Sequence, residues 1–404
     1  MALIVQKFGG SSVADAEKLR RAAEILAETY KKGNDVVAVL SAQGKTTDRL
    51  LAQAAEVAPD ASPRELDALL ATGEQASAAL GAMAVARLGV PAVSLTGWQA
   101  GLRTVGAHGA ARVLRLEGDR IARELKKKNL VIVAGFQGFD VRDDVTTLGR
   151  GGSDTTAAAL AAALHADLCQ IYTDVDGVYT ADPRIVKNAV KLDEISYDEM
   201  LELATLGANV LHNRSVELSR RFGVPLEVLS AFSRRPGTVV RGGAALEQPA
   251  VSGAALDRSA VRFVLSGLED TPGAAWRIFS LLGREGVAAD MLQASMGGGK
   301  TREVAFTVSE KDSRRCEALL RENRDALRFE QIGVRAGLSK VSLVGAGLTG
   351  NPAVAAQLFS ALFEAGVAVH MVSTGETRVS VLVDEADAER ALRAVHAKFF
   401  PRPE

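Results

Sequence analysis

The chain has 404 residues, of which 47% are hydrophobic and 24% are charged, enough sequence for two or three globular domains. Its 48 basic and 49 acidic side chains leave a net charge of -1, so no global positive field exists to hold nucleic acid or an anionic membrane. Its two cysteines, Cys169 and Cys316, exclude a disulfide framework. Residues 1–7 lack the basic region of a signal peptide, and no apolar run reaches the roughly 18 residues of a membrane span. We therefore expect a cytoplasmic protein that acts on small molecules.

Short apolar runs and amphipathic helical patterns alternate along the first part of the chain. Between residues 15 and 33, the apolar side chains of Leu19, Ala22, Ala23 and Leu26 recur with the period of a helix. Buried strands are predicted at residues 3–5, 36–40, 92–95, 130–134 and 168–173. This alternation predicts an α/β fold with a mainly parallel, helix-covered sheet.

A change of pattern near residue 240 marks the end of the first domain. Prolines and glycines cluster between residues 236 and 253, which is typical of a loop or linker. We therefore predict one domain over residues 1–245 and a linker over residues 246–260.

The sequence after the linker repeats itself. Residues 272–291 align without a gap with residues 352–371. Each copy lies between strand-like runs and precedes a further helix, so a β-α-β-β-α unit is predicted over residues 261–337 and again over residues 338–404. Two copies of one unit predict a ligand-sensing module that regulates the first domain. The alternative is a duplicated dimerisation module without a ligand.

The most informative local motif is Val-Gln-Lys-Phe-Gly-Gly-Ser-Ser at residues 5–12, a strand that leads into a glycine pair and then a helix. Glycines allow a phosphate to approach the backbone, the helix N-terminus supplies amide donors, and Lys7 adds a positive charge. The motif therefore predicts a phosphate-binding loop. The alternative is a structural glycine turn with a lysine at its rim.

A second glycine-rich loop, Gly-Arg-Gly-Gly-Ser-Asp-Thr-Thr at residues 149–156, opens an alanine-rich helix whose N-terminus attracts anions. Asp154 is predicted either to cap that helix or to orient the lysine and the Mg²⁺ complex in a phosphoryl-transfer site. Arg150 offers a planar fork suited to a substrate carboxylate. A third polar cluster, at residues 172–184, follows a predicted strand, where α/β folds place ligand-binding loops.

These three clusters, with Ser-Ala-Gln-Gly-Lys-Thr-Thr-Asp at residues 41–48 and Thr-Gly-Glu at residues 72–74, resemble the motifs of the aspartate kinase family. The resemblance implies the amino-acid kinase fold over residues 1–245, followed by two regulatory ACT domains. It also implies Mg²⁺-dependent transfer of the ATP γ-phosphoryl group to the β-carboxylate of L-aspartate, the first step toward lysine, threonine and methionine. The alternatives are a weakly active relative that senses an amino acid and a kinase for another carboxylate, such as glutamate.

The same resemblance gives individual residues their expected roles. Lys7 and Asp154 are expected to be catalytic, and no protein-bound metal is expected because the histidines lack ligand spacing. The expected nucleotide contacts are Lys7, Gly9, Gly10, Ser11, Thr173, Asp174, Tyr179, Asp182 and Arg184. The expected aspartate contacts are Ser41, Thr47, Glu74, Arg150, Gly152 and Ser153. Of these, Glu74 is expected to hold the amino group and Arg150 a carboxylate.

The chain departs from the family pattern at residue 209, where asparagine replaces a lysine that would neutralise the transferring phosphate. Loss of one such donor typically costs about 10²–10³ in rate. We therefore predict slow turnover unless another cation, such as Arg214, takes its place. Asparagine also replaces a frequent proline at residue 213.

The first ACT copy also departs from the family pattern. Asp270 and Thr271 match the turn that binds the effector, whereas Ala294 and Ser295 replace a Gln-Asn pair that contacts it. We therefore predict weak or altered feedback by lysine or threonine at this site. The second copy keeps Thr374 in a family-like segment. The resemblance further implies a homo-oligomer that assembles through the ACT domains, either from one repeated chain or with a short ACT-only subunit.

Overall fold

The computed structural model describes residues 1–404 except 209, 243–250, 272, 297–300, 349–350 and 402–404. The chain divides into two compact units. Unit 1 comprises Met1–Val178, Lys191–Ala204 and Asn209–Leu246, and unit 2 comprises Tyr179–Val190, Thr205–Ala208 and Glu247–Glu404. None of the described helices is long and apolar enough to cross a membrane.

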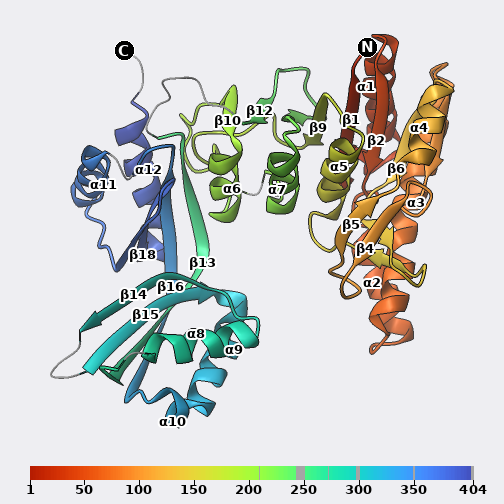
Figure 1. Cartoon of the computed structure of the whole chain (residues 1–404). Coiled ribbons are helices and arrows are strands. Elements are labelled where there is room, and N and C mark those ends of the chain that lie inside the picture. The colour runs from red at the N-terminus through yellow and green to blue at the C-terminus, as the bar shows by residue number, and fades with distance from the viewer. Residues whose placement is uncertain (209, 243–250, 272, 297–300, 349–350, 402–404) are drawn as a thin grey trace. The chain divides into compact units, whose positions relative to one another are not determined.

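Unit 1 is built on an eight-stranded sheet (Figure 1). Its strands are β1 (Leu3–Phe8), β2 (Asp35–Leu40), β3 (Ala92–Leu95), β6 (Leu130–Ala134), β9 (Leu168–Thr173), β10 (Glu194–Ser196), β11 (Leu226–Ser230) and β12 (Thr238–Arg241). They lie in the order β10-β12-β11-β9-β1-β2-β6-β3, and all neighbours run parallel except β11 and β12. The predicted mainly parallel sheet is confirmed.

A smaller sheet and a set of helices complete unit 1. The smaller sheet has the order β5-β4-β7-β8 and consists of β4 (Leu102–Val105), β5 (Arg112–Leu116), β7 (Gln137–Phe139) and β8 (Val145–Thr147). The helices are η1 (Gly10–Val13, a 3-10 helix), α1 (Ala16–Lys31), α2 (Thr46–Val57), α3 (Pro63–Arg87), α4 (Asp119–Lys126), α5 (Gly152–Ala163), α6 (Tyr197–Thr205) and α7 (Asn213–Phe222). The helical pattern read from the sequence is confirmed in α1, where Asp15 caps the N-terminus and Leu19, Ala22, Ala23 and Leu26 are buried.

Strand β1 occupies the centre of the main sheet. Lys7 is in register with Val39 of β2 and with Ile171 of β9, so the carboxyl ends of these parallel strands meet at one edge. The segment after β6 joins the same edge, because Gly135 N donates to the Leu40 carbonyl at 3.0 Å. Open parallel sheets bind their ligands at this edge.

Unit 2 contains a six-stranded antiparallel sheet with the order β14-β15-β13-β16-β18-β17. Its strands are β13 (Gly253–Glu269), β14 (Ala289–Met296), β15 (Thr301–Ser309), β16 (Gln331–Val344), β17 (Met371–Thr374) and β18 (Arg378–Asp384). Its helices are α8 (Ala274–Arg284), α9 (Glu310–Glu322), α10 (Arg324–Leu327), α11 (Pro352–Glu364), η2 (Glu385–Asp387, a 3-10 helix) and α12 (Ala388–Phe399). The repeat in the sequence therefore corresponds to two similar modules that share one sheet.

The long strand β13 serves both modules and changes the predicted boundary. Its first part pairs with the end of β16, from Gly253 opposite Val344, and Ala254 is buried in the core around α11 and α12. Its later part, with Phe263, belongs to the separate core around α8 and α9. The predicted linker over 246–260 is therefore wrong for residues 253–260, because they begin β13 and the side chains of Ala254, Ala255 and Ala260 are buried.

Residues 179–190 lie inside the predicted catalytic range but belong to unit 2. Ala181 and Val186 are buried in the core of its C-terminal module. The Thr180 carbonyl accepts from Ala254 N at 2.7 Å. The Thr180 hydroxyl lies 2.9 Å from Nε2 of His396 on α12. The chain thus leaves unit 1 after Val178 and returns to it at residue 191.

Candidate active site

A buried ion pair joins the two glycine-rich loops of unit 1. Lys7 lies near the end of β1 and Asp154 in the first turn of α5, and Lys7 Nζ is 2.6 Å from Asp154 Oδ1. Their side chains are only 10% and 13% exposed. Gly151, with a φ of 69°, is the N-cap residue of α5. Of the two predictions for Asp154, the helix cap is therefore wrong, and the carboxylate stands beside the lysine.

The glycine pair after β1 lets the loops of the sheet edge pack closely. A Cβ atom on Gly9 would lie 3.3 Å from Lys7 Nζ, and one on Gly10 would lie 2.8 Å from the carbonyl oxygen of Ala42. Ser11 is exposed in η1, a 3-10 helix that precedes the predicted helix α1. The Gly9 amide donates to the Tyr172 carbonyl at 3.2 Å, which ties the loop to the end of β9. Phosphate binding by this loop stays a prediction.

Glu74 of α3 reaches the loop that follows β2. Its Oε1 atom accepts from Ala42 N at 3.1 Å, whereas Oε2 is buried and has no hydrogen-bond partner among the described residues. Burial raises the pKa of Glu74 from 4.5 to about 7. A buried carboxylate with an unpartnered oxygen is a receptor for a cationic group, whose charge would favour the ionised form.

The other five predicted aspartate contacts also lie in unit 1. Gly152 and Ser153 begin α5, and Arg150 precedes them on an exposed loop position. Ser41 directly follows β2, and Thr47 lies half-buried in the first turn of α2. Ser153 packs against the segment after β6, since its Oγ atom would be 2.7 Å from a Cβ atom on Gly135.

The predicted nucleotide contacts divide between the two units. Thr173 ends β9 at the same sheet edge as Lys7 and Asp174 follows it, with the Thr173 hydroxyl 3.1 Å from Asp174 Oδ1. Tyr179, Asp182 and Arg184 belong to unit 2, where Arg184 Nη2 donates to Asp182 Oδ2 at 2.7 Å. This hydrogen bond holds the pKa of Asp182 below its ordinary value.

Asn209, where the chain departs from the family pattern, lies outside the described residues. Slow turnover therefore stays a prediction, which is tested by measuring the turnover of the Asn209→Lys variant. Asn213 is the first residue of α7. The neighbouring Arg214 donates from Nη1 to the Leu148 carbonyl at 2.6 Å and from Nη2 to the Ala111 carbonyl at 3.1 Å. A guanidinium held by two backbone carbonyls is a structural group, so the structure gives no support to Arg214 as the replacement cation.

Sequence reasoning missed two side chains behind the Arg150 loop. Asp67 of α3 is only 1% exposed and accepts hydrogen bonds from Thr147. His212 packs against the loop so closely that a Cβ atom on Gly151 would lie 2.2 Å from its ring, and burial lowers the pKa of His212. No local motif marks either residue, because each acts on a segment more than 50 positions away along the chain.

Potential metal ligands approach one another elsewhere in unit 1. Ligand atoms of His108, Asp140 and Asp144 lie within 4.8 Å of one another, and this group does not include Asp154. Arg64 Nη2 lies 2.6 Å from Asp144 Oδ1 and lowers the pKa of that carboxyl. We assign no cofactor to this group.

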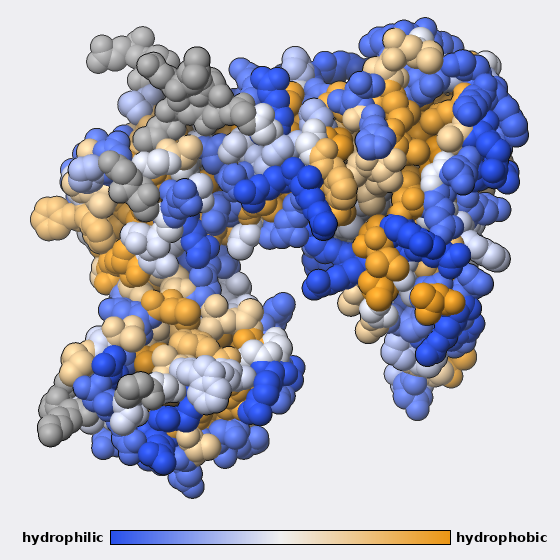
Figure 2. All heavy atoms as spheres, in the orientation of Figure 1, coloured by the Kyte–Doolittle hydropathy of each residue, from blue (hydrophilic) through white to orange (hydrophobic). Residues whose placement is uncertain are grey.

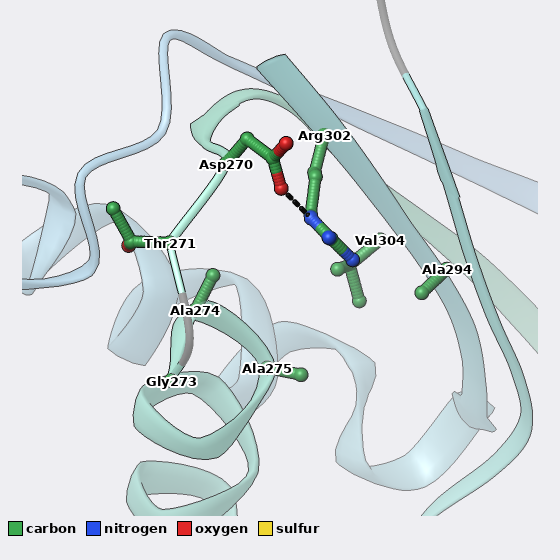
Figure 3. Close-up of a pocket in the computed structure, with 8 residues that line it drawn as sticks. All are labelled: Asp270, Thr271, Gly273, Ala274, Ala275, Ala294, Arg302 and Val304. Atoms are coloured by element: carbon green, nitrogen blue, oxygen red, sulfur yellow. Dashed lines mark hydrogen bonds and ion pairs between the residues drawn. The ribbon is translucent and has the colours of Figure 1, made fainter. Parts of the chain in front are cut away.

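A cavity of about 510 Å³ lies in the first module of unit 2 (Figure 3). Asp270 and Thr271, which follow β13, line it together with Ala294 of β14. Their contact with an effector stays a prediction. Arg302 of β15 also lines the cavity and forms an ion pair with Asp270, a contact that the sequence reasoning missed. Thr374 ends β17 and does not line this cavity, so the structure does not bring the three predicted effector contacts together.

Comparisons with known proteins identify the family of this chain. The model of the amino acid kinase family matches residues 2–230, and that of the ACT domain matches residues 341–399. The chain is 47% identical over 406 residues to the aspartokinase of Mycolicibacterium smegmatis, covering 99% of this chain and 96% of that protein. It is 46% identical over 400 residues to aspartokinase 2 of Bacillus subtilis, covering 99% and 98%.

Solved structures give the same result for the fold. Escherichia coli aspartokinase III in complex with aspartate and ADP superposes with a TM-score of 0.82 at 29% identity, covering 98% of this chain and 100% of that one. The same enzyme in complex with lysine and aspartate superposes with a TM-score of 0.75. This chain belongs to the amino acid kinase family and, within it, to the aspartokinases.

Proposed function

We propose that this chain transfers the γ-phosphoryl group of ATP to the β-carboxylate of L-aspartate, giving 4-phospho-L-aspartate and ADP. The observation that carries the proposal is the buried Lys7–Asp154 pair at the same sheet edge as Glu74. Its support from relatives is the 47% identity to an aspartokinase over 99% of the chain. The product would be the first intermediate toward lysine, threonine and methionine.

The proposed roles follow from the charges of the substrate. Aspartate carries one ammonium group and two carboxylates, and Glu74 with its unpartnered Oε2 suits the ammonium. Arg150 suits one carboxylate through its planar fork. The attacking β-carboxylate is already ionised at neutral pH, so the reaction needs no general base. Lys7, oriented by Asp154, stabilises the negative charge on the transferring phosphoryl group.

Nucleotide binding is proposed at the sheet edge of unit 1. Gly9 lies beside the Lys7 ammonium and is followed by Gly10 and Ser11, while Thr173 ends the neighbouring strand β9 and Asp174 follows it. The contacts of Tyr179, Asp182 and Arg184 stay predictions.

Mg²⁺ is proposed to enter with ATP rather than as a resident cofactor. The donor chemistry fits, since Mg²⁺ prefers carboxylate oxygens and retains several waters, and Asp154 supplies a carboxylate beside Lys7. The cation would neutralise charge on the phosphates. Asp154 would then have two tasks: it holds the Lys7 ammonium at 2.6 Å, and its carboxylate would supply an oxygen ligand to the Mg²⁺ that enters with ATP.

The proposal is tested by trapping the acyl phosphate as a hydroxamate. The purified protein is incubated with ATP, Mg²⁺ and hydroxylamine, with L-aspartate or L-glutamate as the acceptor. We expect product with aspartate that requires ATP. Product with glutamate alone would redirect the assignment to another carboxylate. No product from a folded protein that still binds an amino acid would favour a sensor.

The regulatory part of the proposal is altered feedback through the cavity in the first ACT module. The described lining supplies Asp270 and Thr271 for an amino-acid effector, but Arg302 already neutralises Asp270. We therefore expect weak binding of lysine and threonine. Calorimetric titration that finds tight binding of either amino acid would contradict this expectation.

Assembly through the ACT modules is also proposed. The edge strands β14 and β17 expose Leu292, Met296 and Val372, whose burial would favour pairing with a second copy. Figure 2 shows hydrophilic and hydrophobic residues mixed over the face in view. Light scattering at the elution peak distinguishes a monomer from a homo-oligomer, and a shorter co-purifying chain would identify an ACT-only subunit.

A further inference from the structure

The segment that carries Arg150 is fixed by side chains from two other elements of unit 1. Thr147, the last residue of β8, donates its backbone N–H to Asp67 Oδ2 at 2.8 Å and its hydroxyl to Asp67 Oδ1 at 2.6 Å. Arg214 of α7 holds the carbonyl of the next residue, Leu148, at 2.6 Å. Arg150 follows two residues later. Its position therefore depends on a carboxylate from α3 and a guanidinium from α7.

The same two side chains hold a second segment against the first. Asp67 accepts from Gly109 N at 2.9 Å and lies 3.1 Å from Nδ1 of His108. Arg214 also donates to the Ala111 carbonyl. Residues 108–111 and 147–148 are thus connected through one buried anion and one half-buried cation. A buried carboxylate that accepts several hydrogen bonds is held rigidly, since each lost bond would leave a polar atom unsatisfied.

The loop beyond these anchors has little room to move. Gly149 and Gly151, which flank Arg150, have φ values of 73° and 69°. A Cβ atom on Gly149 would lie 2.9 Å from the Gly109 carbonyl oxygen. A Cβ atom on Gly151 would lie 2.2 Å from the ring of His212. The backbone on both sides of Arg150 is therefore closely packed, and a shift of the anchors is passed on to Arg150.

Helix α3 links this anchor to the proposed ammonium site. Asp67 and Glu74 are seven residues apart, which places them on the same face of the helix about 10.5 Å apart along its axis. Glu74 is the proposed receptor for the ammonium group, and Asp67 holds the loop of the proposed carboxylate receptor. One rigid helix thus sets the separation of the two groups that recognise the substrate.

We propose that Asp67, assisted by Arg214, is a positioning residue for aspartate recognition that acts through Thr147 and the Arg150 loop. The inference rests on the proposed function and deepens it. Within the described part of the chain, the hydrogen bonds of Asp67 go to His108, Gly109 and Thr147, and none goes to the Lys7–Asp154 pair or to the glycine pair after β1. Its loss is therefore expected to weaken aspartate binding and to leave the ATP side of the reaction intact.

The test compares Asp67→Asn and Thr147→Val with Thr147→Ser. Asp67→Asn replaces one acceptor oxygen by an NH₂ donor. Thr147→Val replaces the hydroxyl by a methyl group and keeps the shape of the side chain. We expect the KM for aspartate to rise about 10-fold in the first two variants, as displacement of a recognition group predicts. The KM for ATP and kcat should stay within about 2-fold of wild type. Serine retains the hydroxyl and should restore the KM.

The matched control is Arg64→Gln. Arg64 lies on α3 one turn before Asp67 and pairs with Asp144, the residue directly before β8, whereas Thr147 ends β8. The change therefore breaks a different contact between α3 and the β8 region. It should leave both KM values within about 2-fold of wild type, because Arg64 does not hold Thr147. Partial unfolding would lower the active fraction and kcat but would move neither KM.

A double-mutant cycle with Arg150→Gln completes the test. If Thr147 acts through Arg150, Thr147→Val should change the KM for aspartate by less than about 2-fold once Arg150 is replaced. Equal rises in the KM for aspartate and ATP, or full additivity with Arg150→Gln, would overturn the inference. A wild-type protein that forms no aspartyl phosphate would instead overturn the proposed function, so the two failures are distinguishable.

Discussion

The charged groups at the sheet edge of unit 1 and those in the regulatory cavity of unit 2 form similar ion pairs in different surroundings. Lys7 and Asp154 are 10% and 13% exposed, whereas Arg302 and Asp270 are 45% and 34% exposed. Removing one partner from a buried pair leaves an uncompensated charge, but water and salt screen an exposed pair. We therefore propose that the buried pair sets the geometry of phosphoryl transfer, whereas the exposed pair can break when a ligand binds Asp270.

The largest expected effect comes from breaking the buried pair. Asp154→Asn should lower kcat by about 10²–10³ because Lys7 loses its orientation. It should also lower the free energy of unfolding by about 3–5 kcal/mol, because the ammonium stays buried without a counterion. Steady-state kinetics and urea unfolding measure the two effects. The double variant Lys7→Met/Asp154→Leu should recover much of the stability and none of the activity.

The next effect concerns the buried carboxylate that has no partner. Glu74→Gln should raise the KM for aspartate about 10²-fold, because a neutral amide cannot balance the ammonium group. In wild type, protonation of Glu74 below its pKa of about 7 competes with aspartate, so kcat/KM should fall about 10-fold per pH unit as the pH drops below 7.

The same titration affects stability in the opposite direction. The pKa of Glu74 is higher in the folded chain, about 7, than its ordinary 4.5, so the native state binds the extra proton and wild-type stability should fall as the pH rises from 4.5 to 7. Glu74→Gln should remove this component of the pH dependence. Unfolding measured at several pH values checks it, and identical profiles for wild type and variant would contradict the assigned burial.

A smaller effect is expected when the buried hydroxyl of Thr180 in unit 2 is removed. Thr180→Val removes the hydroxyl that lies 2.9 Å from His396 Nε2 and 3.0 Å from Val190 N, at an expected loss of about 1–3 kcal/mol. Amide hydrogen exchange of residues 179–190 should accelerate. Ser342→Ala, which breaks the buried hydrogen bond between Ser342 of β16 and Ser380 of β18 in the same unit, should leave exchange of residues 179–190 unchanged.

The smallest effect is expected in the regulatory cavity. Arg302→Gln should change the free energy of unfolding by less than about 1 kcal/mol, since both members of the pair are more than one-third exposed. It should strengthen lysine binding, because Asp270 would become available to the ammonium group of the ligand. Calorimetry on wild type and variant measures the change, and unaltered weak binding in both would show that Arg302 does not control the cavity.

The sequence predicts the parts of the site that depend on local motifs. The glycine pair, Lys7 and Asp154 lie at strand ends or helix starts, and parallel topology brings such ends to one edge. The sequence does not predict Asp67, because its partner Thr147 lies 80 positions away and no motif connects them. The start of β13 was also missed, since Gly253 is typical of a turn and only its pairing with Val344 places it in a strand.

The membership of residues 179–190 in unit 2 depends on long-range packing in the same way. Ala181 and Val186 are ordinary apolar residues, and only the core that forms around α12 decides where they are buried. A pattern of strands and helices cannot reveal this, because the segment contains neither. The sequence therefore assigns Tyr179, Asp182 and Arg184 to the first domain, whereas the structure places them in unit 2.

The most direct test of the central claim compares hydroxamate formation from L-aspartate by wild type and Asp154→Asn at saturating ATP and Mg²⁺. Wild type should form product that depends on both substrates, and the variant should form it at least about 10²-fold more slowly while still folded. Equal rates in the two proteins, or no product from folded wild type, would contradict the assignment of the Lys7–Asp154 pair to phosphoryl transfer.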